Sequence, residues 1–215
     1  MRAMKSTPNT DGARLTHPSV ARNRDAILEA LRPHIPPAGT ILEIASGTGE
    51  HAAYLGARLA PGRWLPSDPN PEHRKSIAAW RAHVGPDVLM PVLDIDATAP
   101  RWPVEDTPPA EPITAIIAIN MIHIAPWAAT VGLMAAAGRI LPPGGTLYLY
   151  GAYRVDGKHT AESNVAFEQW LKGLDPAFGV RDMGEVMAEA GRNGLRLTTK
   201  LPMPANNFSL VFTKE

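Results

Sequence analysis

The segment 41–51, with the sequence Ile-Leu-Glu-Ile-Ala-Ser-Gly-Thr-Gly-Glu-His, constrains the fold of this chain more than any other segment. Its apolar start is typical of a buried strand in a parallel sheet, and the spacing of small and apolar residues over 52–59 predicts a helix packed on that sheet. Gly47 and Gly49 lie between the two, where glycine lets the backbone approach a ligand closely. The segment therefore predicts a nucleotide-cofactor loop.

Two classes of cofactor compete for this loop. Residues 47–52 fit the dinucleotide pattern Gly-x-Gly-x-x-Gly/Ala, and Asp68 lies where a ribose-binding acid would follow the second strand. Glu43 argues against a dinucleotide, because it places a carboxylate beside the space that an anionic pyrophosphate would occupy. A cationic ligand is favoured there, and S-adenosylmethionine carries a sulfonium and an ammonium group. A tight strand-to-helix turn without a ligand is the remaining interpretation.

Strand-like segments alternate with helical patterns through the first two thirds of the chain, which predicts a parallel sheet with helices on both faces. Pro91 predicts an edge position for the third strand, and Pro66 must stand at a strand end or a bulge, because the second strand is interior. The expected strands are 41–44, 63–67, 88–93, 113–119 and 146–150. The expected helices are 19–31, one from the glycine loop to near Pro61-Gly62, one opened by Asn70 and Pro71, and one opened by Pro126.

The last third of the chain departs from this alternation. Two helical stretches, 164–171 and 182–190, precede two β-rich runs, 195–201 and 208–213, which we expect to form an antiparallel pair. A mostly parallel sheet closed by such a pair is the plan of class I methyltransferases. The expected fold is therefore an α/β, Rossmann-like sandwich with a seven-stranded sheet in the order 3-2-1-4-5-7-6.

Composition limits the partners of the chain. Its 215 residues, 45% hydrophobic, predict one domain over 18–215 behind a loosely ordered lead-in at 1–17. Equal numbers of basic and acidic residues give no global reason to expect nucleic acid or an anionic membrane, so a small-molecule partner is expected. The absence of cysteine excludes disulfides and thiol catalysis. No stretch has the length of a membrane helix or the apolar core of a signal peptide, so a cytoplasmic location is expected. The proline-rich stretch 100–112 is expected to be a surface loop.

Several short motifs indicate a particular family of proteins. They are Ala-Arg-Asn at 21–23, Leu-Glu-Ile-Ala-Ser-Gly-Thr-Gly-Glu-His at 42–51, Pro-Ser-Asp at 66–68, Asn-Met-Ile-His-Ile at 120–124, Gly-Lys-His-Thr-Ala-Glu-Ser-Asn at 157–164, Arg-Asp at 181–182 and Met-Pro-Ala-Asn-Asn at 203–207. With them the chain resembles the S-adenosylmethionine-dependent methyltransferases over nearly all of 20–214, and among these the methyltransferase-like protein 26 family. The resemblance implies the fold and the cofactor more firmly than the substrate.

The resemblance also implies roles for individual residues. Glu43, Gly47 and Gly49 would face the methionine part of the cofactor, with His51 in the same motif. Asp68 would bind the ribose hydroxyls. The remaining contacts implied are Asp94 and Ile95 at the adenine, Asn120 near the sulfonium, and Arg22 and Asn23 over the cofactor's entrance. Each has a structural alternative: the two aspartates could cap turns, and the Arg-Asn pair could begin a helix.

One residue departs from the methyltransferase pattern. Ala45 stands where glycine is common, which costs little only if that position needs no positive φ. We still count Ala45 among the cofactor-binding residues.

Methyl transfer from a sulfonium mainly requires an aligned acceptor, and a base helps only when the acceptor is a hydroxyl or a protonated amine. The candidates are His123, His159, Tyr153 and Asp182, with His123 first and packing under Trp127 as its alternative. Residues 157–164 could form a lid or cap the following helix. No spacing supports a metal site.

The sequence therefore predicts an S-adenosylmethionine-dependent methyltransferase acting on a small molecule. The alternatives are a catalytically silent module that binds the same cofactor and an NAD(P)-dependent oxidoreductase. Asn-Met-Ile-His at 120–123 differs from the Asn/Asp-Pro-Pro-Tyr motif of enzymes that methylate amino groups of adenine or glutamine.

Overall fold

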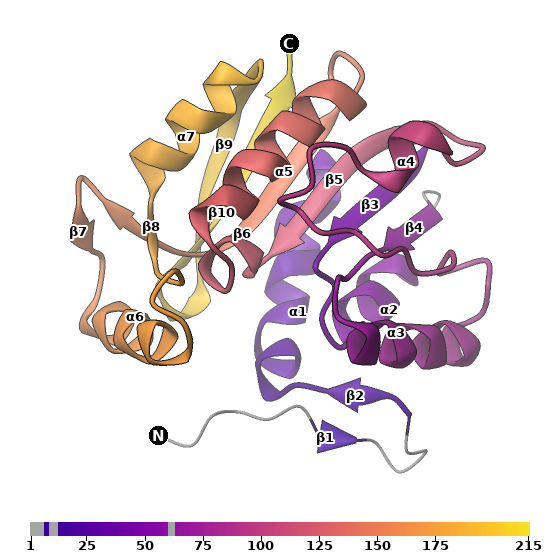
Figure 1. Cartoon of the computed structure of the whole chain (residues 1–215), viewed down its shortest axis with the longest axis horizontal. Helices are drawn as coiled ribbons and strands as arrows, with labels where there is room; N and C mark the ends of the chain where they lie inside the picture. The colour runs from indigo at the N-terminus through magenta and orange to yellow at the C-terminus, as the bar shows by residue number, and fades with distance from the viewer. Residues whose placement is uncertain (1–6, 9–12, 60–62) are drawn as a thin grey trace.

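A mostly parallel β-sheet with helices on both faces forms the centre of the molecule (Figure 1). The computed structural model describes residues 7–8, 13–59 and 63–215. The main path of the sheet is β4-β3-β5-β6-β10-β9, in which β10 runs antiparallel to both of its neighbours. The strands are β3 Thr40–Ile44, β4 Arg63–Pro66, β5 Ile113–Ile119, β6 Thr146–Val155, β9 Leu195–Met203 and β10 Asn207–Lys214. The predicted class I methyltransferase fold with its antiparallel C-terminal pair is confirmed.

The predicted third strand is reduced to isolated contacts. Residues 88–93 form two parallel bridges to the β4 edge, Trp64 with Leu89 and Ser67 with Leu93, and no continuous strand. Pro91 has no N–H to donate to a ladder, which explains the interruption. The edge position is as predicted, but the strand count differs from seven. Pro66 is the last residue of β4, as its interior position required.

The two faces of the sheet carry separate apolar clusters. The first includes Ile41 and Trp64 and lies under α1 Pro18–Leu31, α2 Glu50–Gly56 and α3 Pro71–Val84. The second includes Leu133 and Phe212 and lies under α4 Pro103–Asp106, α5 Trp127–Ile140 and α7 Met183–Arg192. In Figure 1, α5 and α7 cross in front of the sheet and α1 lies behind it.

The predicted helices are present, with small shifts at their ends. Asn70 caps α3 by accepting a hydrogen bond of 2.9 Å from the Glu72 backbone N–H. The helix after the glycine loop ends at Gly56, earlier than expected, and the predicted end near Pro61-Gly62 falls outside the described residues. The helices predicted at 164–171 and 182–190 are α6 Glu162–Leu174 and α7.

Strand β6 is longer than predicted. It was expected to end at Tyr150 and leave through Gly151, but it continues to Val155 because β10 pairs with it through Gly151 and Ala152. Its outer end then pairs with two short strands, β7 Lys158–His159 and β8 Arg181–Asp182. This extension carries Tyr153 and Arg154 beyond the carboxyl edge of the other strands.

The lead-in and the proline-rich loop are both tied to the domain. Strand β2 Leu15–Thr16 pairs with β1 Thr7–Pro8, and the Leu15 N–H donates to Ser76 Oγ at 2.8 Å. The segment 15–16 is thus tied to α3. In the loop 100–112, Trp102 and Val104 are buried. None of the helices in the described part of the chain is both long and apolar enough to span a bilayer.

Candidate functional site

The carboxyl ends of β3, β4 and β5 meet at one edge of the sheet, as in parallel sheets generally. The Ser46 N–H donates to the Ser67 carbonyl at 2.8 Å, and the Asp68 N–H donates to the Leu93 carbonyl at 3.1 Å. The Gly47 N–H donates to Asp68 Oδ2 at 2.8 Å. The structure therefore brings together the glycine loop, Asp68 after β4, and the end of the segment 88–93.

The two glycines of the loop serve different purposes. Both have positive φ, +58° at Gly47 and +83° at Gly49. A Cβ added at Gly49 would lie 2.8 Å from Cγ1 of Ile77 on α3, so this glycine lets α3 pack against the loop. A Cβ added at Gly47 would meet no atom within 4 Å. The space beside Gly47 is therefore open, as a ligand-binding loop requires.

Glu43 is a buried acid under the loop, with 2% of its surface exposed. Trp64 Nε1 donates to Glu43 Oε2 at 3.0 Å. Burial raises the pKa of Glu43 to about 7, and the negative charge of Asp68 adds to this, although hydrogen bonds from Trp64 and Ser46 oppose it. Within the described residues Glu43 has no ion pair. A cationic group bound beside the loop would provide the positive counter-charge for the Glu43 carboxylate.

The raised pKa of Glu43 gives a pH dependence with a defined sign. The folded protein holds this proton more tightly than the unfolded chain, whose glutamate has the ordinary pKa of 4.5. The stability from protonated Glu43 is thus fully present below that value and is lost as the pH rises through about 7. We expect the urea midpoint of the free protein to fall over this range in the wild type and to stay flatter in Glu43→Gln. The exposed acid Glu72, changed to Gln, is the control, and an equal slope in both variants would contradict the prediction.

Asp68 is tied into the loops around it. Besides Gly47, its carboxylate accepts from the Asn70 N–H at 2.9 Å and lies 3.1 Å from His73 Nδ1. Three of the about four acceptor positions of a carboxylate are therefore in use. The turn-capping role and the predicted ribose-binding role fall on one side chain, which is 3% exposed.

Arg74 links the residue after β4, Asp68, to Asp94, which follows the segment 88–93. Its Nη1 donates to the Asp68 carbonyl at 3.0 Å, and its Nη2 lies 3.0 Å from Asp94 Oδ2. The Asp94 side chain is 65% exposed and is thus open to a ligand. Ile95 next to it is buried in the core, so only its backbone is placed for a contact.

The start of α1 covers the loop from another side. His51 Nε2 and Asn23 Oδ1 are 2.8 Å apart, and the Tyr150 hydroxyl also hydrogen-bonds to Asn23. Burial lowers the pKa of His51 to about 4, so its ring is neutral at pH 7. Asn120 is at φ +60°, with its N–H donating to the Tyr150 carbonyl at 2.8 Å. Arg22 is exposed on α1.

Ala45 does need a positive φ, contrary to the condition under which alanine would cost little there. Its φ is +55°, in the left-handed region that disfavours residues with a Cβ. Ala45→Gly should therefore raise the free energy of unfolding by up to about 1 kcal/mol, because relief of strain exceeds the added flexibility of the unfolded chain. Urea unfolding measures this, with Ala79→Gly in the middle of α3 as the control that should lose stability. Lower stability in Ala45→Gly would contradict the strain.

His123 and Tyr153, two of the predicted catalytic residues, are completely buried and pack edge to face with ring centroids 5.4 Å apart. Neither nitrogen of His123 has a hydrogen-bond partner in the described structure. Burial lowers the pKa of His123 to about 3, with the positive charge of Arg181 adding to the effect. Burial raises the pKa of Tyr153. In this arrangement both rings belong to the core, and His123 is a weak base.

The other two candidates hold the outer part of β6 together. His159 Nε2 lies 2.6 Å from Glu168 Oε2. Asp182 caps α7 by accepting from the Gly184 N–H at 2.8 Å, and it also accepts from the Gly157 N–H at 2.7 Å. The described structure shows no contact between these residues and the glycine loop. A structural role explains their positions.

Three residues at the edge were missed by the sequence reasoning: Trp64, Arg74 and Tyr150. Trp64 occupies a strand position that reads as core, and Arg74 lies on an exposed helix face. Trp64 reaches Glu43 only through the pairing of β3 with β4, and Arg74 reaches Asp94 only because α3 packs beside the segment 88–93. Tyr150 at the end of the predicted fifth strand carried a usable signal, because side chains at the carboxyl ends of parallel strands line such sites.

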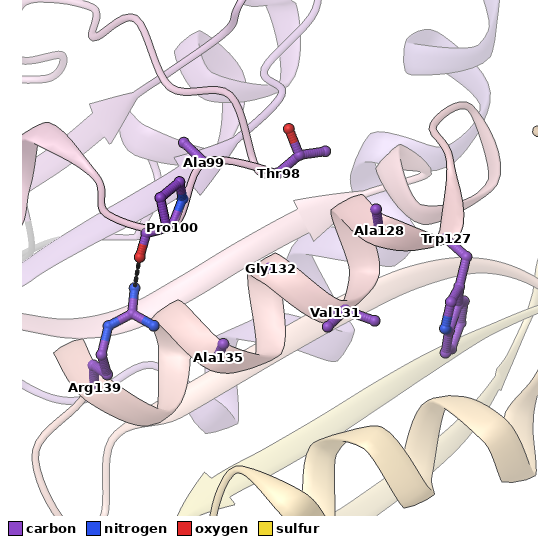
Figure 2. A pocket seen from close by; sticks show the side chains of 9 residues that line it. All are labelled: Thr98, Ala99, Pro100, Trp127, Ala128, Val131, Gly132, Ala135 and Arg139. Atoms are coloured by element: carbon purple, nitrogen blue, oxygen red, sulfur yellow. Dashed lines mark hydrogen bonds between the residues drawn. The ribbon is translucent and has the colours of Figure 1, made fainter.

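A hollow of about 460 Å³ lies elsewhere, between the segment 98–100 and α5 (Figure 2). Small side chains of α5 form its floor, and Arg139 closes one end by donating to the Pro100 carbonyl at 3.1 Å. Its lining includes none of the predicted site residues.

Solved structures with the same fold include methyltransferases. An O-methyltransferase family 2 protein from Planctomyces limnophilus, in complex with apigenin, is 17% identical with a TM-score of 0.73, covering 92% of this chain and 60% of that one. Human N-acetylserotonin methyltransferase in complex with S-adenosylmethionine is 14% identical with a TM-score of 0.70, covering 91% and 52%. The chain thus spans about half to three fifths of the length of these proteins. At such identity the likeness establishes the fold.

The family follows from the sequence. A family model described as "Protein of unknown function (DUF938)" matches residues 14–214, and the chain belongs to this family. The description does not name the methyltransferase-like protein 26 family, so that resemblance stays a prediction.

Proposed function

We propose that this protein is an S-adenosylmethionine-dependent methyltransferase with a small-molecule acceptor, related to the methyltransferase-like protein 26 family. The observation that carries the proposal is the buried, unpaired acid Glu43 beneath a glycine loop with open space at Gly47. The cofactor's methionine part is cationic at its ammonium and sulfonium, which suits this acid. The likeness to solved methyltransferases, one of them in complex with S-adenosylmethionine, supports the proposal.

In the proposed complex, Glu43 and the loop from Ala45 to Gly49 hold the methionine part of the cofactor. Asp68 binds the ribose, and Asp94 with the Ile95 backbone binds the adenine. The exposed Asp94 carboxylate is already oriented by Arg74. When bound, the cofactor supplies an activated methyl group, so the chain's task is to position the acceptor and exclude water.

A second candidate function is a module that binds the cofactor without turnover. The burial of His123 and Tyr153 favours it, because a base at the open edge is then missing from the predicted set. Acceptors that need no base, such as neutral amines or thiolates, remain compatible with methyl transfer. The dinucleotide alternative is disfavoured by Glu43, which places an acidic side chain under the loop where an anionic pyrophosphate would lie.

Transfer of a labelled methyl group tests the proposal. The protein is incubated with methyl-labelled S-adenosylmethionine and metabolite extracts, and small molecules are examined for label. We expect label with the wild type and with Asp96→Ala, and much less with Asp68→Ala; Asp96 is an exposed acid that only caps a local turn. Cofactor binding without label in any extract would favour the silent module over the enzyme.

A further inference from the structure

A second hollow, of about 430 Å³, lies outside the candidate cofactor site. Its lining residues are Trp127, Arg154, Arg181, Glu185, Ala188 and Arg192, and we call it the arginine groove. It contains three basic side chains and one acid. None of the residues proposed to bind the cofactor lines it, so its ligand would not be the cofactor.

The extension of β6 creates the arginine groove. Arg154 lies on the outer end of β6 and Arg181 on β8, which pairs with it in parallel. The start of α5 provides Trp127 and the exposed side of α7 provides Glu185 and Arg192. Figure 2 shows the Trp127 ring projecting away from the segment 98–100, and this ring forms the aromatic wall of the groove.

Arg181 is fixed in place but not neutralised. Its Nε donates to the Ile122 carbonyl at 2.9 Å, and its Nη2 donates to the Ala125 and Ala177 carbonyls at 2.6 and 2.9 Å. These acceptors carry no net charge, so the guanidinium is held rigidly with its charge uncompensated by them. Burial lowers the pKa of Arg181 and the charge of Arg154 lowers it further, although the acids Glu168 and Glu185 oppose this shift.

Arg154 is the cation with the least compensation in the groove. Its Nε is buried without a hydrogen-bond partner among the described residues, and no ion pair to it is formed there. The charge of Arg154 helps to lower the pKa of Glu168, but the Glu168 carboxylate already pairs with His159 at 2.6 Å and with Lys172 at 3.1 Å.

The remaining charges leave the groove positive. Arg192 pairs with Glu189 at 2.6 Å, outside the groove lining. Glu185 is the single acid of the lining, and its charge acts on Arg181. Two guanidinium groups without a paired acid, in a groove with an excess of positive charge, are an arrangement that binds an oxyanion.

We propose that the arginine groove binds an oxyanion, a phosphate or carboxylate group of a small molecule, through Arg154 and Arg181. The guanidinium groups of Arg154 and Arg181, neither of which forms an ion pair among the described residues, provide charge-assisted donors, and Trp127 provides an apolar wall for the rest of the ligand. The proposal is independent of methyl transfer, because it depends on residues that the cofactor site does not use.

Calorimetric titration of the full chain tests this, with inorganic phosphate and citrate as separate probes at matched ionic strength. We expect saturable binding of at least one probe, weakened about tenfold or more in Arg154→Gln. Arg196→Gln, which removes an exposed arginine paired with Glu215, is the matched control and should bind as the wild type does. Phosphate binding alone assigns a phosphate group, and citrate binding alone assigns carboxylates.

A second variant tests the proposal even if Arg154→Gln does not fold. Arg192 is 69% exposed, so Arg192→Gln should fold normally and weaken the same probe by a smaller factor. Absence of saturable binding for both probes would overturn the proposal. Equal losses in Arg154→Gln and Arg196→Gln would also overturn it, because they would reflect total charge and not this groove.

Discussion

Asp68→Ala should weaken binding of S-adenosylhomocysteine by about 1 to 3 kcal/mol, a factor of about 5 to 150. Two effects combine: the proposed hydrogen bonds to the ribose disappear, and the Gly47 N–H loses the acceptor that holds the loop at 2.8 Å. The substitution also lowers stability, because the Gly47 and Asn70 N–H groups both lose their acceptor. Calorimetry measures the affinity, and circular dichroism verifies that the variant is folded at the temperature used.

Two further variants separate binding from loop structure. Asp68→Asn keeps one oxygen acceptor, so it should lose less stability than Asp68→Ala and still bind the cofactor more weakly than the wild type. Asp96→Ala, which removes an exposed acid from the neighbouring turn, should bind normally. Wild-type affinity in Asp68→Ala would remove this residue from the proposed site.

Gly151→Ala should destabilise the protein by about 1 to 3 kcal/mol or more. A Cβ at this position would lie 2.0 Å from Nε2 and 2.6 Å from Cδ2 of His123. The imidazole is fully buried beside Tyr153, so it cannot turn away without displacing other core atoms. Urea unfolding measures the loss, and Gly173→Ala in α6, where a Cβ would meet nothing within 4 Å, is the control.

The double variant Gly151→Ala/His123→Ala identifies the cause. Removing the imidazole makes room for the methyl group, so the double variant should lose less stability than the sum of the two single losses. His123→Ala alone should leave cofactor binding nearly intact. Additive losses would contradict the packing account, and a slower methyl transfer at unchanged affinity would restore His123 as the predicted base.

The parts of the fold with local signals could be predicted from the sequence. The apolar run of β5 ends at Asn120 as predicted, and the Asn70-Pro71 pair marks the start of α3. The antiparallel pair β9 and β10 follows from two β-rich runs joined by a short turn. These features depend on neighbours in the sequence, which is why the pattern alone identifies them.

The errors concern interactions between distant segments. β6 continues through Gly151 because β10, more than 50 residues later in the sequence, pairs along it. Pro91 interrupts a strand whose position was otherwise correct. The positive φ of Ala45 and the burial of His123 depend on the assembled sheet edge, and residue type alone indicates neither.

The candidate site was likewise predicted in part from the sequence. Glu43, Gly47 and Asp68 are brought together as the acid and glycine pattern predicted, whereas the predicted bases are not brought to the loop. Hydrogen bonds to carboxylates and burial of histidines depend on which strands are neighbours, so they require the three-dimensional structure.

Calorimetric titration of the wild-type protein with S-adenosylmethionine, S-adenosylhomocysteine, NAD and NADP is the most direct test of the central claim. We expect saturable binding of the first two ligands with dissociation constants in the micromolar range, roughly 8 kcal/mol of binding free energy, and no binding of the dinucleotides. Binding of NAD or NADP without binding of S-adenosylmethionine would contradict the assignment of the glycine loop.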